Sequence, residues 1–352
     1  MTSNVVVRPS GRSFSTDEGE TLLDAGLRQG VTLPYGCRDG ACGACKAKLL
    51  CGEVTMTGSW QPRALSETEA AEGQVLMCRA HASGEVEIEC RGVVAEGVIA
   101  PRKFPARVAS LARPSDDVVV LRLQLPASER AQFNAGQFLD IILRDGTRRS
   151  YSIANAPHLA EQVELHIRHV PGGRFTDTLF GKAEPALKER DILRIEMPLG
   201  TFFLRQSNRP ALLLATGTGF GPIKAMVEHA IHTADPRELR LYWGGRTLKD
   251  LYAHDTALEL ERQAKEAGVD FTYVPVLSRP APEDNWTGRT GHVQDVALAD
   301  ESDYSVWQAY ACGSPAMVDS ARRALVERGD LLEDNYFADA FTTAADNAVP
   351  HA

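Results

Sequence analysis

Residues 34–45 read Pro-Tyr-Gly-Cys-Arg-Asp-Gly-Ala-Cys-Gly-Ala-Cys, and this stretch decides the fold of the first part of the chain. Its cysteines, Cys37, Cys42 and Cys45, have the spacing C-x4-C-x2-C, and Cys78 follows thirty-three positions after Cys45. Three glycines lie beside or between these cysteines. Because glycine lets a backbone turn sharply and approach a bound group closely, the pattern predicts a loop that wraps a compact object.

Four thiolates at this spacing are the ligand set of a plant-type [2Fe-2S] cluster, in which each iron takes two cysteines. The sequence therefore predicts that Cys37, Cys42, Cys45 and Cys78 converge as metal ligands. A zinc site usually joins two C-x2-4-C pairs, but Cys78 has no neighbouring cysteine at that spacing. Disulfides suit a small secreted domain, and the N-terminal residues lack the apolar segment of a signal peptide.

Length and composition bound the remaining functions. A chain of 352 residues is too long for one ordinary core, so two or three domains are expected. The net charge of −9 argues against a nucleic-acid partner and against an anionic membrane surface. No apolar run reaches the roughly 18 residues needed to cross a bilayer. We therefore expect a cytoplasmic protein that is a monomer.

Residues 1–92 are predicted to form a compact α+β unit. Its expected elements are strands at 5–7, 13–15, 47–50 and 85–89 and a helix at 21–29. Gly30 directly follows the apolar helical pattern, as is typical of a helix end. Cys51 and Cys90 have no partner at ligand spacing, so each is expected to be a free thiol that is either buried or at a strand end.

Residues 93–103 are predicted to be a linker, and residues 104–203 an antiparallel β-barrel. Apolar runs separated by Pro, Gly and Asp clusters indicate strands with no long helix between them. The runs lie at 106–112, 118–125, 138–143, 163–169 and 191–197. One short helix is expected at 175–181.

Two stretches of the predicted barrel carry residues suited to a cofactor. Arg149, Tyr151 and Ser152 could respectively hold a phosphate, lie against a planar ring and hydrogen-bond a ring nitrogen. The same residues could also be an ordinary strand. Gly172-Gly173 precedes a predicted helix whose free N–H groups would suit a pyrophosphate, or it forms a simple turn.

Residues 204–352 alternate between strands and helices, which predicts a parallel sheet covered on both faces. Strands are expected at 211–215, 239–243, 270–277 and 305–311, and helices at 223–231, 251–268, 293–298 and 316–327. After the first strand stands Gly217-Thr218-Gly219-Phe220-Gly221-Pro222, at the edge where such folds bind nucleotides. This turn matches neither a G-x-G-x-x-G fingerprint nor a Walker A loop.

Residues 1–92 resemble a plant-type ferredoxin of the β-grasp kind, and about residues 104–345 resemble the ferredoxin–NADP reductase family. Four segments carry the second resemblance in the family's order: Arg149-Ser-Tyr-Ser, Gly172-Gly173-Arg-Phe-Thr176, Gly217 to Pro222, and Cys312-Gly313-Ser314-Pro315. The complete chain resembles the one-protein reductases of multicomponent oxygenases, arranged ferredoxin–FAD–NAD. It is also similar to CDP-6-deoxyglucoseen reductases.

The resemblance implies a [2Fe-2S] cluster, FAD and NAD(P)H as cofactors, and it assigns roles to individual residues. The implied residues are Arg149, Tyr151, Ser152 and Phe341 at the flavin ring; Arg168, Gly173 and Thr176 at the ribityl and pyrophosphate groups; Gly217, Thr218 and Gly219 at the NAD(P)H pyrophosphate; and Cys312 beside the nicotinamide. Ser152 is expected near the reactive flavin nitrogen. Cys312 is expected to be a small shape-setting residue.

NAD(P)H gives two electrons at once and the cluster accepts one, so a flavin between them is needed. The implied acceptor is the oxygenase of a Rieske-type aromatic-ring system in aromatic hydrocarbon catabolism. Alternatives are a di-iron monooxygenase or a CDP-deoxysugar dehydrase, and more distantly a redox-sensing module without turnover. The loop at Arg38 and Asp39 is expected to face the acceptor.

The choice of coenzyme depends on the residues after the third strand of residues 204–352. Ser278-Arg279 stands where a 2′-phosphate could be held, and Arg289 could add positive charge or cap a helix. NADH is expected, with NADPH as the alternative. The tail after Phe341 is expected to be disordered.

Overall fold

The computed structural model describes residues 2–38, 40, 42–57, 64–90, 92–93 and 99–342. Contacts within the chain divide it into two compact units. The first unit comprises Met1–Ile99, Gly200–Phe202 and Asp339–Ala352, and the second comprises Ala100–Leu199 and Phe203–Ala338. Asp39, part of the predicted linker and the predicted disordered tail from residue 343 lie outside the described residues.

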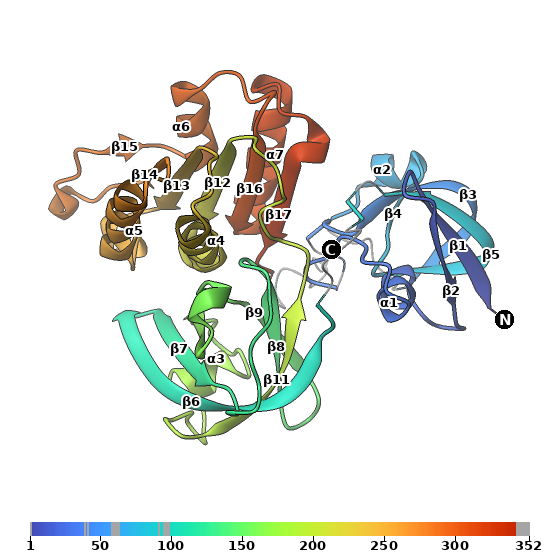
Figure 1. Ribbon diagram of the computed structural model, residues 1–352, viewed down its shortest axis with the longest axis horizontal. Coiled ribbons are helices and arrows are strands. Elements are labelled where there is room, and N and C mark those ends of the chain that lie inside the picture. Colours follow the sequence, from blue (N-terminus) through green and yellow to red (C-terminus); the bar gives the residue numbers. More distant parts are fainter. Residues whose placement is uncertain are drawn as a thin grey trace. The chain divides into compact units, whose positions relative to one another are not determined.

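A five-stranded sheet with the order β2-β1-β5-β3-β4 forms the first unit (Figure 1). Its elements are β1 (Ser3–Arg8), β2 (Arg12–Thr16), α1 (Leu22–Arg28), β3 (Lys46–Met56), α2 (Glu67–Ala71), β4 (Gln74–Leu76) and β5 (Ala80–Glu89). β1 pairs antiparallel with β2 and parallel with β5. The predicted α+β ferredoxin fold is confirmed.

Alternating burial along β5 and the ends of α1 follow directly from the sequence. Val86 and Ile88 are 3% and 0% exposed, while the glutamates beside them are less buried. The side chain of Thr21 accepts a hydrogen bond from Asp24 N–H at 3.1 Å and so caps the start of α1. Gly30, just beyond the helix, has a φ of 76°, which glycine adopts without strain.

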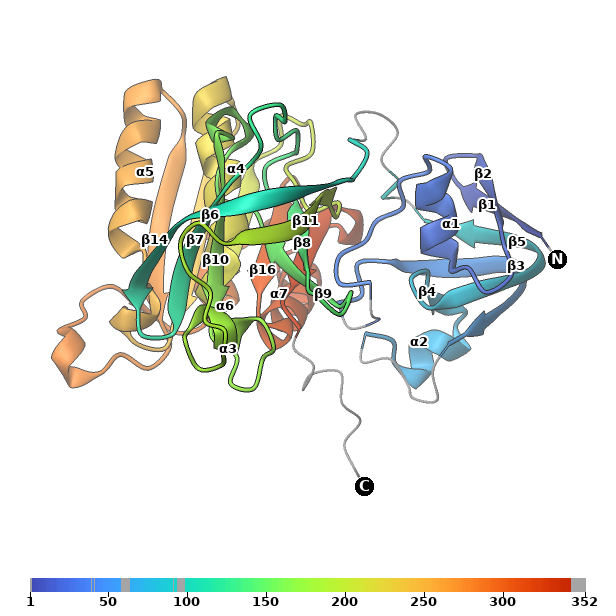
Figure 2. The same cartoon turned by 90° about the horizontal axis from the view of Figure 1, so that it is seen from below.

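In the second unit, a six-stranded antiparallel sheet has the order β10-β7-β6-β11-β8-β9 (Figure 2). Its elements are β6 (Arg102–Ser115), β7 (Val118–Gln124), β8 (Phe138–Ile142), β9 (Arg148–Ser152), β10 (Gln162–Arg168), α3 (Thr176–Leu179) and β11 (Ile192–Leu199). A bridge between Ile153 and Leu165 joins the chain after β9 to β10, so the sheet closes on itself. The predicted antiparallel barrel is confirmed.

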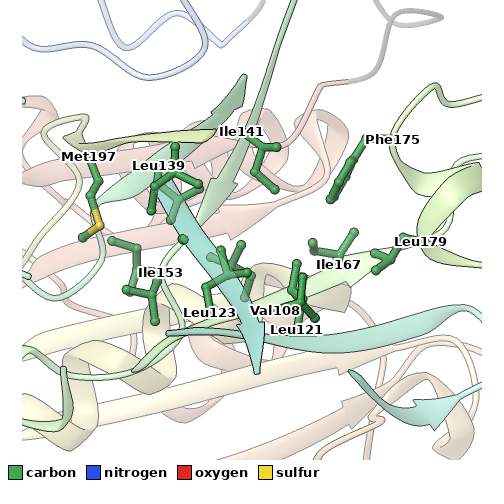
Figure 3. Close-up of a cluster of buried hydrophobic side chains, with 14 of the residues drawn as sticks. Val108, Leu121, Leu123, Leu139, Ile141, Ile153, Ile167, Phe175, Leu179 and Met197 are labelled. Atoms are coloured by element: carbon green, nitrogen blue, oxygen red, sulfur yellow. The ribbon is translucent and has the colours of Figure 1, made fainter. Parts of the chain in front are cut away.

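Apolar side chains fill the interior of this barrel, as Figure 3 shows. Leu121, Leu139 and Ile153 come from different parts of the sheet and are 0% exposed. Phe175, which directly precedes α3, and Leu179, the last residue of α3, join the same cluster. Full burial of such a side chain contributes about 1.5–3 kcal/mol, so the cluster is a main source of the barrel's stability.

A second six-stranded sheet in this unit has the order β15-β14-β13-β12-β16-β17. Its strands are β12 (Ala211–Thr216), β13 (Leu239–Gly245), β14 (Phe271–Leu277), β15 (Arg289–Thr290), β16 (Gln308–Gly313) and β17 (Tyr336–Ala340). Its helices are α4 (Phe220–Thr233), α5 (His254–Ala267), α6 (Val293–Asp300) and α7 (Pro315–Arg328). β12 to β16 pair in parallel, with α4 and α5 on one face and α6 and α7 on the other (Figure 1).

The order of the strands reverses between β12 and β16, which makes this position a topological switch point. In open parallel sheets, ligands bind outside the carboxyl ends of the strands at such a point. The turn Gly217–Gly219 directly follows β12, and Gly313 ends β16. The fold therefore brings the predicted nucleotide turn and the Cys312 segment together.

Several predicted boundaries differ from the structure. β6 begins at Arg102, so the end of the predicted linker is strand. The strand expected at 305–311 begins only at Gln308. Cys90 is buried as expected, but the prediction for Cys51 is wrong: Cys51 is exposed in the middle of β3, beside two register shifts.

Candidate cofactor sites

The four predicted cluster ligands lie in the first unit as two pairs. Cys42 N–H donates to Cys37 Sγ at 3.3 Å, and Cys37 N–H donates to Cys42 Sγ at 3.4 Å. Cys45 Sγ lies 3.2 Å from Cys78 Sγ, and both side chains are buried. Cys42 and Cys45 are close enough to interact electrostatically, so the two pairs adjoin.

Two adjoining pairs of thiols fit a two-iron cluster. Each iron of a [2Fe-2S] cluster takes two cysteines, whereas a structural zinc needs four ligands around one point. The pairs Cys37–Cys42 and Cys45–Cys78 match the two thiols that each iron of such a cluster takes.

Contacts around the loop hold it in a shape that suits cluster binding. A Cβ added at Gly36 would lie 3.2 Å from Cys42 Sγ, so this position has little room for a side chain. Arg38 has a φ of 63°, which is uncommon for a residue other than glycine. Its guanidinium forms an ion pair with Asp24 on α1 and lies 5.6 Å from the centroid of the Tyr35 ring.

Two segments from later in the chain complete the first unit. Thr201 Oγ1 accepts a hydrogen bond from Tyr35 N–H at 3.0 Å, beside the first ligand. Asp339 is 7% exposed, and its Oδ1 would lie 3.3 Å from a Cβ at Gly36. A buried carboxylate beside the ligand loop was not predicted, because no sequence pattern connects positions so far apart.

On β9, the predicted flavin residues occupy one strand but not one face. Arg149 and Tyr151 are two positions apart and share a face, whereas Ser152 lies on the other. Arg149 forms no ion pair with any described carboxylate. Its neighbour Arg148, in contrast, is neutralised by Asp140 at 3.0 Å and by Glu196. Of the two arginines, Arg149 is therefore the one suited to an anionic group.

Tyr151 packs into the edge of the barrel core. Its ring centroid lies 5.6 Å from that of Phe175, with the rings tilted by 47°. Burial raises the pKa of its hydroxyl well above the usual range, so this group stays protonated at neutral pH. Ser152 pairs across the ladder with Phe138 and directly precedes the Ile153 bridge to β10.

The predicted glycine turn before α3 is tight and bonded to itself. Gly172 has a φ of 76°, and a Cβ at Gly173 would meet Thr176 Oγ1 at 2.4 Å. Thr176 Oγ1 donates to the Val170 carbonyl at 2.8 Å. In this structure the hydroxyl of Thr176 therefore locks the turn, and a role at the FAD ribityl or pyrophosphate remains a prediction.

Arg168 connects the barrel to the nucleotide turn. A Cβ at Gly217 would lie 3.3 Å from Arg168 Nη1, so the guanidinium lies against this glycine. Arg168 Nε is buried 3.2 Å from Asp117 Oδ2 but has no hydrogen-bond partner in the described part of the chain. The Asp117 carboxylate therefore balances the charge of Arg168, although the buried Nε–H makes no hydrogen bond to it.

Close backbone packing holds the glycine turn against β16. A Cβ at Gly219 would lie 2.2 Å from the Cys312 carbonyl oxygen, which no side chain tolerates. Ser314 N–H donates to Thr216 Oγ1 at 3.3 Å across the same switch point. Thr218 lies in the middle of the turn and is half-buried. Cys312 is 0% exposed, which fits a packed residue and not an accessible thiol.

Aromatic residues that the sequence did not single out support this turn. Trp243 Nε1 donates to the Gly217 carbonyl at 3.1 Å. The Trp243 ring stacks on Phe220 at 4.0 Å between centroids, and Tyr252 lies edge-on to it at 5.4 Å. Phe220 belongs to the predicted turn, but Trp243 and Tyr252 come from other segments and carry no local signal.

The residues expected to select the coenzyme lie at the ends of β13, β14 and β15. Ser278 N–H and Arg279 N–H donate to the carbonyls of Gly245 and Arg246. Arg279 and Arg246 are both exposed. Arg289 pairs with Asp300 at 2.5 Å, so its charge is already balanced, and it does not cap a helix as one expectation had it.

Phe341 directly follows β17 and is half-buried. It belongs to the same unit as Asp339 and the cysteine loop. Its predicted place over the flavin ring stays a prediction.

A cysteine-rich ferredoxin unit, a flavin-type barrel and a nucleotide-binding sheet define a class of protein: a flavin- and nicotinamide-dependent iron–sulfur reductase. Three family profiles match the chain in this order. The 2Fe-2S iron-sulfur cluster binding domain matches residues 5–83, the oxidoreductase FAD-binding domain residues 105–204, and the oxidoreductase NAD-binding domain residues 213–323.

Similar proteins cover almost the whole chain. The chain is 39% identical to a CDP-6-deoxy-L-threo-D-glycero-4-hexulose-3-dehydrase reductase of Yersinia pseudotuberculosis over 97% of this chain and 99% of that protein. It is 35% identical to reductase component 1 of a Comamonas terephthalate 1,2-dioxygenase, over 98% of each. Among solved structures, the Amycolatopsis cytochrome P450 reductase GcoB matches with a TM-score of 0.76 and 32% identity, covering 97% and 99% of the two chains.

The chain belongs to the ferredoxin–NADP reductase family. It is an oxidoreductase whose domains bind a [2Fe-2S] cluster, FAD and NAD(H). Within the described residues, no helix has the length and apolar character needed to span a membrane.

Proposed function

We propose that this protein takes electrons from NADH and delivers them, by way of FAD and the [2Fe-2S] cluster, to the oxygenase component of a Rieske-type aromatic-ring dioxygenase system. The observation that carries the proposal is the presence in one chain of two adjoining cysteine pairs and of a nucleotide turn packed against a flavin-type barrel. The similarity to a terephthalate dioxygenase reductase over 98% of the chain supports this acceptor.

Bound FAD would supply two-electron chemistry toward NADH and one-electron chemistry toward the cluster, so that single electrons could reach the acceptor. The residues of this chain bind and orient the groups. Arg149 supplies positive charge that no described carboxylate pairs with, and Tyr151 offers an aromatic face at the barrel edge. Arg168, which forms an ion pair with Asp117, lies against Gly217 of the nucleotide turn. The Gly217–Gly219 turn lets a pyrophosphate approach the backbone at the switch point.

NADH is the proposed coenzyme. The match of residues 213–323 to an oxidoreductase NAD-binding domain supports it. Arg289 is paired with Asp300, but the exposed Arg246 and Arg279 at the ends of β13 and β14 favour the alternative, NADPH. A 2′-phosphate would be held by such arginines, so Arg279→Ala is the informative change. In the unchanged protein, kcat/KM should be higher for NADH than for NADPH. Arg279→Ala should lower kcat/KM for NADPH further.

An anaerobic titration of the coloured protein tests the whole path. NADH should bleach the flavin and cluster absorption bands, and NADPH should do so only at higher concentration. Bleaching of the flavin alone would contradict internal transfer to the cluster. A reconstituted protein whose spectrum ignores both coenzymes would remove the reductase proposal and leave the sensing-module alternative.

A CDP-deoxysugar dehydrase is the second candidate acceptor, because the sugar dehydrase reductase from Yersinia has the higher identity of the two, 39% against 35%. A di-iron monooxygenase is a third, since a phenol 2-monooxygenase reductase component is 33% identical. Acceptor-dependent NADH oxidation should be measured with one purified acceptor of each kind. The highest kcat/KM identifies the class, and a dehydrase that outperforms the dioxygenase would replace the first proposal.

A cytoplasmic monomer with no nucleic-acid or membrane partner completes the proposal. The net charge of −9 supports the lack of a nucleic-acid partner. Light scattering of the purified protein at several concentrations tests the monomer.

A further inference from the structure

A buried cluster of charged side chains joins the barrel to the nucleotide-binding sheet inside the second unit. Lys224 on α4 lies 3.2 Å from Glu164 Oε1 on β10 and 2.6 Å from Glu228 Oε1 on its own helix. Its ammonium also donates to the Ala154 carbonyl at 2.9 Å. Lys224 and Glu164 are each 8% exposed, so these charges are removed from water.

Alternating residues of β10 place the side chains of this cluster on the face of the strand that lies against α4. Glu164, His166 and Arg168 are two positions apart and therefore share a face of the strand. On the opposing helix a Cβ at Gly221 would lie 3.6 Å from His166 Cβ, so the strand and helix approach closely there. α4 lies on the side of its sheet that faces the barrel (Figure 1).

The cluster holds both halves of the cofactor site. Ala154, which accepts from Lys224, follows Ser152 by two positions. Ala156 N–H donates to Glu228 Oε2 at 2.9 Å, so a second bond fixes the same segment. α4 itself begins directly after the Gly217–Gly219 turn. Lys224 thus connects two short segments: the one that follows β9, the strand that carries the predicted flavin residues and is called the flavin strand below, and the one that follows the nucleotide turn.

A second route runs from the same cluster to the turn. His166 Nε2 lies 3.0 Å from Glu164 Oε1 and His166 Nδ1 lies 2.6 Å from the Tyr252 hydroxyl. Burial lowers the pKa of His166, so the ring is neutral, donates from Nε2 and accepts from Tyr252. Tyr252 packs on Trp243, whose indole N–H bonds the Gly217 carbonyl.

The charges balance inside this cluster of Lys224, Glu164, Glu228, His166 and Arg122, which is called the seam below. Burial of Glu164 opposes its ionisation, but the hydrogen bond from His166 and the charges of Lys224 and Arg122 outweigh it and hold its pKa far below the usual range. Two carboxylates, Glu164 and Glu228, therefore face two cations, Lys224 and Arg122. Buried ion pairs of this kind add little stability compared with apolar side chains, but they demand a fixed geometry.

We propose that Lys224 is a positioning residue for the reaction: its bonds to Ala154, Glu164 and Glu228 fix the spacing between the flavin strand and the Gly217–Gly219 turn, and this spacing sets the rate of hydride transfer. The step is the movement of a hydride from NADH, which leaves as NAD⁺, to the oxidised flavin. The inference rests on the proposed reductase function, but it concerns the transfer rate and not the identity of the acceptor.

Anaerobic stopped-flow reduction of the bound flavin by NADH tests the inference in the full-length, FAD- and cluster-loaded protein. Lys224→Met should lower the limiting rate of flavin reduction by about tenfold or more, since displacement of a reacting group by about 1 Å can cost a hundredfold. The Kd for NADH should change less than threefold. The long-wavelength absorption of the NADH–flavin charge-transfer complex should weaken. Lys265→Met, an exposed change in the last turn of α5, is the matched control and should behave as the unchanged protein.

Removal of Lys224 alone leaves the buried Glu164 and the half-buried Glu228 with one cation, Arg122, so a second variant guards against misfolding. Glu164→Gln/Lys224→Met keeps the charges balanced and should melt close to the unchanged protein, yet it still lacks the bond to Ala154 and should still reduce its flavin slowly. A fast double variant, or a fast Lys224→Met, would overturn the positioning role. Failure of the unchanged protein to react with NADH would instead overturn the proposed function, and the inference with it.

Discussion

Two adjacent arginines on β9 show that the partners of a residue determine what it can bind. Arg148 is held by Asp140 and Glu196, whereas among the described residues Arg149 donates to the Arg148 carbonyl alone, at 2.7 Å. The sequence marks Arg149 by its place in Arg-Ser-Tyr-Ser, and the ion pairs of its neighbour give an independent reason for the same choice. A guanidinium without a carboxylate is ready to bind a phosphate.

Arg149→Ala should weaken FAD binding by the value of a hydrogen bond to a charged group, about 1.5–3 kcal/mol. This corresponds to a Kd raised roughly tenfold to a hundredfold. Fluorescence of released flavin on dilution measures the change. Arg144→Ala, in the exposed loop before β9, is the control and should keep its FAD. Equal retention by both variants would remove Arg149 from the flavin site.

His166 should make the protein less stable as the pH falls. Its pKa is lowered by burial, so below the usual histidine value of about 6.5 the unfolded chain binds a proton that the folded chain does not. Stability that is complete above about pH 6.5 is therefore lost progressively below it. The melting temperature between pH 7 and pH 5 should fall more steeply in the unchanged protein than in His166→Gln. Parallel curves would show that another group dominates.

At the scale of elements, the turn between β12 and α4 is tightly packed backbone. Gly219 has no room for a Cβ because the Cys312 carbonyl would lie 2.2 Å away. The turn and β16 therefore fit together only with a glycine at this position. The sequence shows the glycines, but only the fold shows which atom they accommodate.

Gly219→Ala should displace the turn and slow flavin reduction by NADH at least as much as it lowers stability. Bound FAD should remain, because the barrel residues are untouched. The control is Gly268→Ala after α5, where φ is 72° but nothing lies within 4 Å of the added Cβ. It should cost about 1 kcal/mol of stability and leave the NADH reaction unchanged. A Gly219→Ala protein with a normal NADH reaction would contradict the close packing.

Most periodic elements were predictable from the sequence, as were the short helix α3 and the short strand β2, whereas the shortest strands were not. The helices α1, α4, α5 and α7 and most strands follow from apolar spacing and from glycine at their ends. β15 has two residues and β4 has three, too few for any period to show. Cys51 was misplaced because β3 runs on past the predicted end, with register shifts on both sides of this residue.

For the whole molecule, the site residues that could be predicted are those that lie close together in the sequence as short motifs. Three of the four cysteines, the predicted flavin residues of β9 and the glycine turn each occupy a short stretch of sequence. The seam around Lys224 joins residues from β7, β10 and α4, so its members carry no joint signal along the chain. The same holds for Asp339 beside the cysteine loop.

Electron exit can be tested at the same scale. Asp39→Lys, in the cysteine loop, should change the rate with the protein acceptor and the dependence of that rate on salt, because exposed charges steer association. Flavin reduction by NADH should not change, since it precedes this step. Asp39 lies outside the described residues, so the expectation rests on its position between Cys37 and Cys42. Unchanged acceptor kinetics would place the exit elsewhere.

The two cysteine pairs differ in their separation along the chain. Cys37 and Cys42 are 5 positions apart, whereas Cys45 and Cys78 are 33 apart. The pairing of β3 with β4 and a 2.9 Å hydrogen bond from Met77 N–H to the Cys45 carbonyl hold the second pair together. The first pair therefore depends on the shape of one loop, whereas the second depends on the folded sheet. A change that loosens β4 from β3 would separate Cys78 from Cys45 and leave Cys37 and Cys42 together.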